Sequence, residues 1–134
     1  TESIDAFLQG LVENCPFLEE LHVGHFHLSN RQLKVLTRLR FLQYIHLHSP
    51  TQAELAHYLT NLHPHRGPRV IAIMQSDHAS FNFRLEPVLH SALDSLGKSG
   101  RLREFCAEFE HPDDVCTDAE CAAKRILKDG FVRG

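Results

Sequence analysis

The sequence predicts an α/β fold built from repeated units, each with a helix on the outside and a short parallel strand on the inside. Two observations support this prediction. An L-x-x-L-x-L pattern of apolar residues occurs at 18–23 and returns 24 residues later at 42–47. Between the two copies the apolar residues are spaced by three and four, which is typical of a helix. A stack of helix–strand units is therefore the expected architecture.

The length and composition agree with one such stack. The chain has 134 residues, of which 43% are hydrophobic and 23% charged. This is enough to build one apolar core and too little for two well-buried ones. We therefore expect residues 1–134 to form a single domain of about four repeats, in which 110–134 form a C-terminal cap.

Each expected strand follows a segment with helical spacing. The apolar positions of the four segments are Ile4, Phe7, Leu8, Leu11 and Val12, then Leu33, Leu36 and Leu39, then Leu55, Tyr58, Leu59 and Leu62, and finally Leu85, Val88, Leu89, Ala92, Leu93 and Leu96. Ser29 and Thr51 suit the N-caps of the second and third helices, and Gly97 and Gly100 suit the end of the fourth.

The third and fourth copies of the strand pattern are degenerate. The third places Ile71 and Ile73 in the inward positions, and the fourth places Phe105 and Ala107 there. The 34-residue spacing between these copies contains an insertion, and 76–84 shows no clear period. We expect this insertion to be a long mobile loop.

The amino-acid sequence of the first repeat resembles that of a known family. The segment from Phe7 to Leu21, with the Cys15 and Pro16 pair ahead of its leucines, resembles the cysteine-containing repeats of F-box/LRR proteins and their ribonuclease-inhibitor-like relatives. The resemblance implies a leucine-rich-repeat horseshoe segment with parallel inner strands and outer helices. It also implies that the chain is a fragment of a longer protein, the substrate-recognition part of an SCF-type ubiquitin ligase.

Alternation along the strands separates core from surface. Leu21, Val23, Ile45 and Leu47 are expected in the core, and the residues between them on the concave inner face. Because a solenoid exposes such strand side chains over a broad surface, we expect a protein partner to bind there. The residues expected to contact it are Glu20, His22, Tyr44, His46, His48, Val70 and Met74.

Nothing in the sequence suggests catalysis or a cofactor. The chain has no Gly-rich phosphate loop, no Gly-x-Ser-x-Gly and no His-Glu-x-x-His motif. The sequence therefore predicts a non-catalytic interaction module.

A metal-binding domain is the alternative, because 11 of the residues are histidines. His22, His46 and His48 point the same way on neighbouring strands, and three imidazoles can bind zinc. The plainer interpretation is that these are solvent-facing positions that accept any polar residue, since no carboxylate is evident to orient the rings.

A second possible metal site lies near the C-terminus. Cys106, His111, Cys116 and Cys121 are spaced by five residues, which differs from the usual zinc pattern of close cysteine pairs. The competing interpretation is that of buried structural thiols, with 118–127 forming a C-terminal helix against the stack.

Charge and hydropathy argue against nucleic acid and membrane as partners. The formal net charge of −3 argues against a dedicated nucleic-acid domain. No apolar run reaches the roughly 20 residues that span a bilayer. Four cysteines could form two disulfides, but Cys15 lies about 90 residues from the other three. We therefore expect a reduced, intracellular protein, cytoplasmic or nuclear.

Overall fold

The fold is seen in a computed structural model of the chain, which describes residues 2–23, 27–63, 66–75, 85–109, 124–128 and 131–132. Within these ranges there are four helices and one sheet of six strands. In chain order the elements are α1 (Glu2–Asn14), β1 (Glu20–Val23), α2 (Asn30–Leu36), β2 (Tyr44–His48), α3 (Gln52–Thr60), β3 (Val70–Gln75), α4 (Pro87–Lys98), β4 (Glu104–Phe109), β5 (Lys124–Lys128) and β6 (Phe131–Val132).

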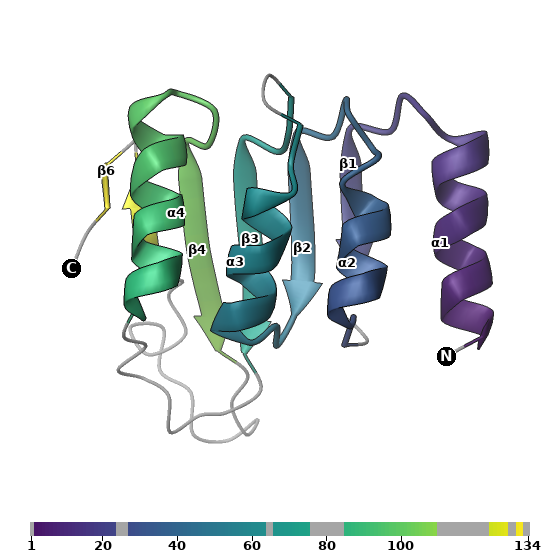
Figure 1. Cartoon of the computed structure of the whole chain (residues 1–134), viewed down its shortest axis with the longest axis horizontal. Coiled ribbons are helices and arrows are strands. Elements are labelled where there is room, and N and C mark those ends of the chain that lie inside the picture. Colours follow the sequence, from purple (N-terminus) through teal and green to yellow (C-terminus); the bar gives the residue numbers. More distant parts are fainter. Residues whose placement is uncertain are drawn as a thin grey trace.

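The strands lie in the sheet in the same order as in the chain (Figure 1). β1 to β4 are parallel, and each connection between them contains a helix, as parallel neighbours require. β5 and β6 continue the sheet in antiparallel fashion. The predicted α/β class with parallel strands and intervening helices is confirmed.

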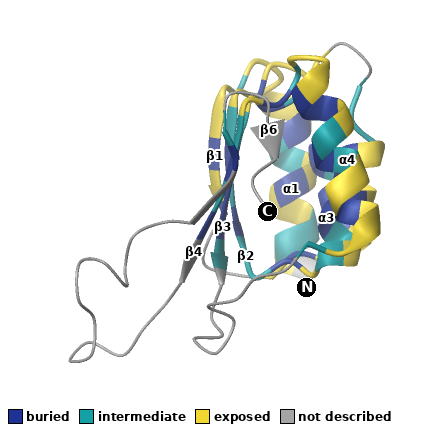
Figure 2. Ribbon diagram, turned by 90° about the vertical axis from the view of Figure 1, so that its left-hand side faces the viewer, coloured by how far each residue is buried: buried dark blue, intermediate teal, exposed yellow. Residues whose placement is uncertain are grey.

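The helices form a layer on one face of the sheet (Figure 2). No helix among the described residues covers the opposite face of β1–β4. One side of each strand therefore faces a helix layer, and the other faces away from it.

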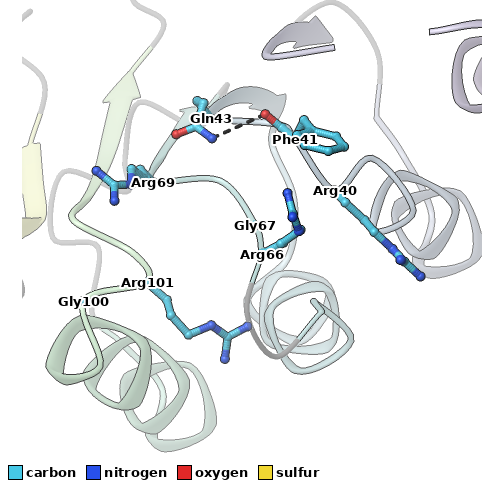
Figure 3. Close-up of a pocket in the computed structure, with 8 residues that line it drawn as sticks. All are labelled: Arg40, Phe41, Gln43, Arg66, Gly67, Arg69, Gly100 and Arg101. Atoms are coloured by element: carbon cyan, nitrogen blue, oxygen red, sulfur yellow. Dashed lines mark hydrogen bonds between the residues drawn. The ribbon is translucent and has the colours of Figure 1, made fainter. Parts of the chain in front are cut away.

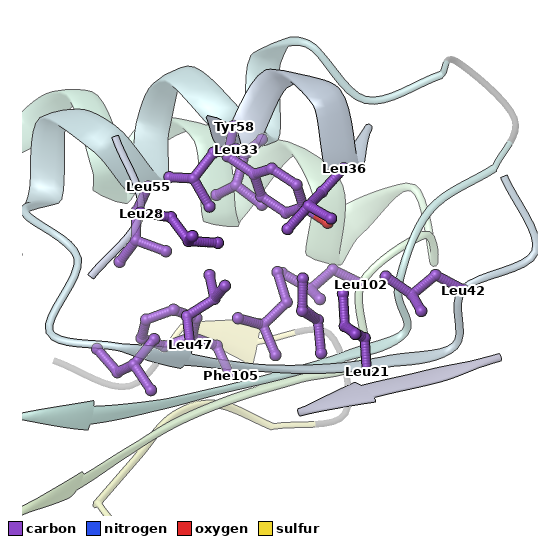
Figure 4. Close-up of a cluster of buried hydrophobic side chains, with 14 of the residues drawn as sticks. Leu21, Leu28, Leu33, Leu36, Leu42, Leu47, Leu55, Tyr58, Leu102 and Phe105 are labelled. Atoms are coloured by element: carbon purple, nitrogen blue, oxygen red, sulfur yellow. The ribbon is translucent and has the colours of Figure 1, made fainter. Parts of the chain in front are cut away.

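The core lies between the two layers, and it follows the strand register. Two rows of apolar side chains cross the sheet and point at the helices: Leu21, Ile45, Ile71, Phe105 and Leu127 in one row, and Val23, Leu47, Ile73 and Ala107 in the other. All are buried, at no more than 7% exposure. Leucines from the helices and their connections close over these rows (Figure 4). The inward positions predicted for all four parallel strands are confirmed.

On α1 and α4, fewer apolar side chains are buried than the helical spacing of the sequence indicated. Leu8 and Val12 of α1 and Leu89 and Leu93 of α4 are buried. Phe7 and Val88, which share the helical spacing, are instead 50% and 67% exposed. Both lie outside the strip of side chains that faces the sheet, although they belong to the helical pattern.

Local capping fixes where the helices begin. Ser29 and Thr51 are the N-caps of α2 and α3, each accepting a hydrogen bond from a backbone N–H three residues later. The side chains of Gln32 and Glu54 bond back to the cap N–H groups, which completes a capping box at each helix.

The end of α4 differs in part from the prediction. Gly100 follows the helix with φ of +76°, a left-handed conformation that glycine adopts without strain. Gly97 lies within the last turn of α4 and is buried there, so it does not end the helix.

The predicted C-terminal helix is wrong where the structure describes it. Residues 124–128 form β5, which pairs with β4, and Leu127 is buried opposite Phe105. A strand edge offers unpaired N–H and C=O groups, so pairing with β4 satisfies backbone groups that a helix there would leave open. The expected loop at 76–84 lies outside the described residues, as does 110–123.

None of the helices in the described ranges is long and apolar enough to span a bilayer.

Candidate functional site on the open sheet face

The candidate site is the side of β1–β4 that faces away from the helices, here called the open face. Its described residues are Glu20, His22, Tyr44, His46, His48, Val70, Ala72, Met74, Glu104 and Cys106. All seven residues expected to contact a partner belong to it.

The register arranges the open face in three rows. The first row runs from Glu20 through Tyr44 and Val70 to Glu104. The second runs from His22 through His46 and Ala72 to Cys106, and the third contains His48 and Met74. Each row carries one side chain per strand, about 4.8 Å apart.

Exposure varies across this surface. The side chains of Glu20 and His22 are 71% and 60% exposed. Tyr44, His46 and Met74 are half-buried. Ala72 is only 1% exposed although it lies on the open face, because its small side chain stands between the longer ones of its row. The middle of the face is thus filled by side chains.

Aromatic rings gather at the β1 and β2 end. The ring centroid of His22 lies 5.1 Å from that of Tyr44 and 6.0 Å from that of His46. The His22 Nε2 atom is also 3.8 Å from a carboxylate oxygen of Glu20. His22 is therefore held among a phenol, an imidazole and a carboxylate.

The three-imidazole cluster of the metal-binding alternative does not form among the described residues. His48 lies in the next row, opposite Met74, and only His22 and His46 come together. No group of three His, Cys, Asp or Glu side chains in the described part of the chain is arranged to hold a metal ion. The histidines therefore share a face of the sheet without forming a common ligand set.

The C-terminal cysteine and histidine set lies mostly outside the described residues, so it stays a prediction. Cys106 is half-buried on β4, while His111, Cys116 and Cys121 lie outside the described ranges. Cys15, the other described cysteine, is exposed at the end of α1.

The carboxyl end of β2 has a turn that the sequence did not reveal. Ser49 has φ of +40°, which is unusual for a residue other than glycine. Its backbone N–H and its hydroxyl both donate to the Met74 carbonyl, at 2.6 and 3.1 Å. Beside it, the Nδ1 atom of His48 is buried without a hydrogen-bond partner among the described residues. The two bonds tie the end of β2 to the end of β3.

A pocket at the opposite end of the strands also escaped prediction. It has a volume of about 370 Å³ and opens near the amino ends of β2, β3 and β4. It is lined by Arg40, Phe41, Gln43, Arg66, Gly67, Arg69, Gly100 and Arg101 (Figure 3). The available signal was the return of arginine just ahead of each of these strands.

Comparison of the chain with known protein families, curated proteins and solved structures finds no match. Function is therefore argued from the geometry of the chain itself.

Proposed function

We propose that the chain is a non-catalytic protein-binding module whose open face contacts a partner protein. The observation that supports this most strongly is the asymmetry of the sheet. Four helices cover one face, while three ordered rows of mixed aromatic, apolar and polar side chains line the other without a helix over them in the described residues.

The chemistry of the open face suits a protein surface. Tyrosine and methionine are enriched at protein interfaces, and Tyr44 and Met74 are only partly buried here. The carboxylates of Glu20 and Glu104 stand at the two ends of the first row. An apolar and aromatic centre with charges toward its margin is the usual anatomy of an interface.

The strands of the open face supply only part of an interface. Four strands about 4.8 Å apart and about five residues long cover an area of roughly 14 by 17 Å. A stable interface buries about 800 Å² on each partner, which is more than this patch offers. A partner of the open face would therefore also contact surface beyond these strands.

The repeated helix–strand units are the basis on which we also propose a protein family. The parallel strands, the helices on one side and the apolar rows in register are the features that leucine-rich repeats share. We therefore propose a leucine-rich-repeat segment that, as in F-box/LRR proteins, recognises the substrate of an SCF-type ubiquitin ligase.

Affinity capture with matched variants tests the proposal. Tyr44→Glu places a charge in the middle of the open face, whereas Val88→Glu places the same charge on the exposed side of α4. We expect the proteins captured by the natural chain, measured by quantitative mass spectrometry, to be lost with Tyr44→Glu and kept with Val88→Glu.

His22→Ala serves as a second variant, because its 60% exposed side chain contributes little to stability. Thermal melts establish that each variant is folded. The same capture by all three variants would contradict the assignment of the open face.

A further inference from the structure

The pocket at the amino ends of the strands contains an unusual concentration of positive charge. Arg40, Arg66, Arg69 and Arg101 supply four of its eight lining residues (Figure 3). They come from three successive connections between a helix and the strand that follows it. The fold therefore brings together arginines that are up to 61 residues apart in sequence.

These arginines are not neutralised by carboxylates in the part of the chain that the structure describes. The guanidinium of Arg66 lies over the Phe41 ring, 4.6 Å from its centroid, and Arg101 donates to the His63 carbonyl. Arg40 and Arg69 make no side-chain hydrogen bond or ion pair with described residues. Elsewhere in the described residues, basic side chains form ion pairs. For example, a guanidinium nitrogen of Arg31 lies 2.9 Å from a carboxylate oxygen of Asp5.

The negative ends of the helices neutralise only part of the positive charge of these arginines. α2, α3 and α4 all end toward this edge, and each C-terminus carries about half a negative charge. Together they can offset at most about 1.5 of the four positive charges. Arg40 and Arg69 bond no helix carbonyl, so an excess of positive charge remains.

We propose that this pocket binds an anion bearing more than one phosphate charge. Guanidinium groups form paired hydrogen bonds with phosphate oxygens, and these are stronger than bonds between neutral groups. The pocket volume of about 370 Å³ lies in the range of small-molecule sites, so it accommodates more than an isolated water-sized ion. Gln43 adds an amide on the strand side of the opening (Figure 3).

Exposed arginine side chains can close on such a ligand. Arg40, Arg66 and Arg69 are exposed. Arg69 and Arg40 lie on opposite sides of the opening, and their guanidinium groups point away from each other (Figure 3). Their long side chains can rotate toward a shared anion without moving the backbone. The same phosphate chemistry occurs in a free polyphosphate and in a phosphorylated residue of a protein, and the experiment below separates these sources.

Calorimetric titration with pyrophosphate is the primary test. We expect saturable binding at one site, weakened about tenfold by either Arg40→Gln or Arg69→Gln, because each removes one charge-assisted contact. Neither side chain bonds another described residue, so both variants should keep the melting temperature of the natural chain. Arg38→Gln is the matched control, since Arg38 is also exposed but does not line this pocket.

A second titration uses a blocked Gly-phosphoserine-Gly peptide and its unphosphorylated form. Binding of pyrophosphate but not of the phosphopeptide identifies a free polyphosphate as the ligand, and the reverse identifies a phosphorylated protein segment. Either result supports the pocket if Arg40→Gln and Arg69→Gln weaken it more than Arg38→Gln does. Absence of saturable binding by both probes, or equal loss in all three variants, would overturn the proposal.

Discussion

The two faces of β1–β4 differ sharply although they are built from alternating residues of the same strands. Ile45 is fully buried under the helices, while the next residue, His46, lies half-buried on the open face. The covered face is uniformly apolar, whereas the open face mixes carboxylates, imidazoles, a phenol and a thioether. Packing thus dictates the residues of one face, whereas it leaves the chemistry of the other face free to vary.

Truncation on the covered face should produce the largest effect. Ile45→Ala removes a side chain with no solvent exposure, and we expect the free energy of unfolding to fall by about 2–5 kcal/mol. Leu21→Ala, at 7% exposure on the first strand, should fall near the lower end of that range.

His46→Ala changes the next residue on the opposite face and serves as the control. We expect it to cost less than about 1 kcal/mol, because a partly exposed side chain loses little burial. Urea denaturation measures all three variants. A loss below about 0.5 kcal/mol for Ile45→Ala would mean that the two faces are not divided as described.

The helix layer that covers the sheet should depend on its caps. Thr51→Ala removes the acceptor for the Glu54 N–H, a bond of 3.1 Å at the start of α3. The expected cost is about 1 kcal/mol, the usual value of an N-cap. Thr60→Ala, at the far end of the same helix, is the control in the same denaturation series, and an equal cost at both positions would speak against the capping box.

The covered side also contains a polar group, the hydroxyl of Tyr58. A hydroxyl on the open side could bond to water instead. The hydroxyl of Tyr58 is buried without a hydrogen-bond partner among the described residues, and burial raises the pKa of this phenol well above its usual value. Tyr58→Phe should therefore leave stability unchanged or raise it by up to about 1 kcal/mol. A loss of more than about 1 kcal/mol in thermal or urea melts would show that the hydroxyl is satisfied.

The smallest expected effect is a dependence of stability on pH through Glu54. Partial burial acts to raise the pKa of this carboxyl, but hydrogen bonds from the Thr51 N–H and from His27 outweigh it, so the pKa lies below its ordinary value. Lowering the pKa stabilises the fold above the unfolded value of about 4.3, and this contribution is lost as the pH falls through the folded value.

Glu54→Gln replaces the carboxylate with an amide, whose oxygen can still accept the bond from the cap N–H, and it removes the titrating group. We expect the free energy of unfolding of this variant to fall less steeply than that of the natural chain between about pH 5 and about pH 3. Parallel slopes in the two proteins would exclude Glu54 as a source of acid sensitivity.

The sequence was most informative where burial constrains it. The inward rows through Ile71 and Phe105 were predicted despite their degenerate pattern, because a strand buried on one side needs an apolar residue at every second position. The caps at Ser29 and Thr51 were predicted because their chemistry is local.

The sequence was least informative where structure depends on distant partners. Residues 124–128 carry a pattern compatible with a helix, and only the open edge of β4 makes them a strand. The placement of His48 away from His22, and the gathering of four arginines in one pocket, follow from strand stacking. The positions of these residues in the sequence do not give the distances between their side chains in the fold.

We propose that the open face binds a partner protein, whereas the covered side maintains the fold. Site-specific photocrosslinking separates these two roles, with a benzophenone amino acid in place of either Tyr44 on the open face or Val88 on the exposed side of α4. Irradiation in cells should join the chain to another protein from position 44 and not from position 88. Crosslinks from position 88 alone, or none from position 44 in a folded chain, would contradict the account.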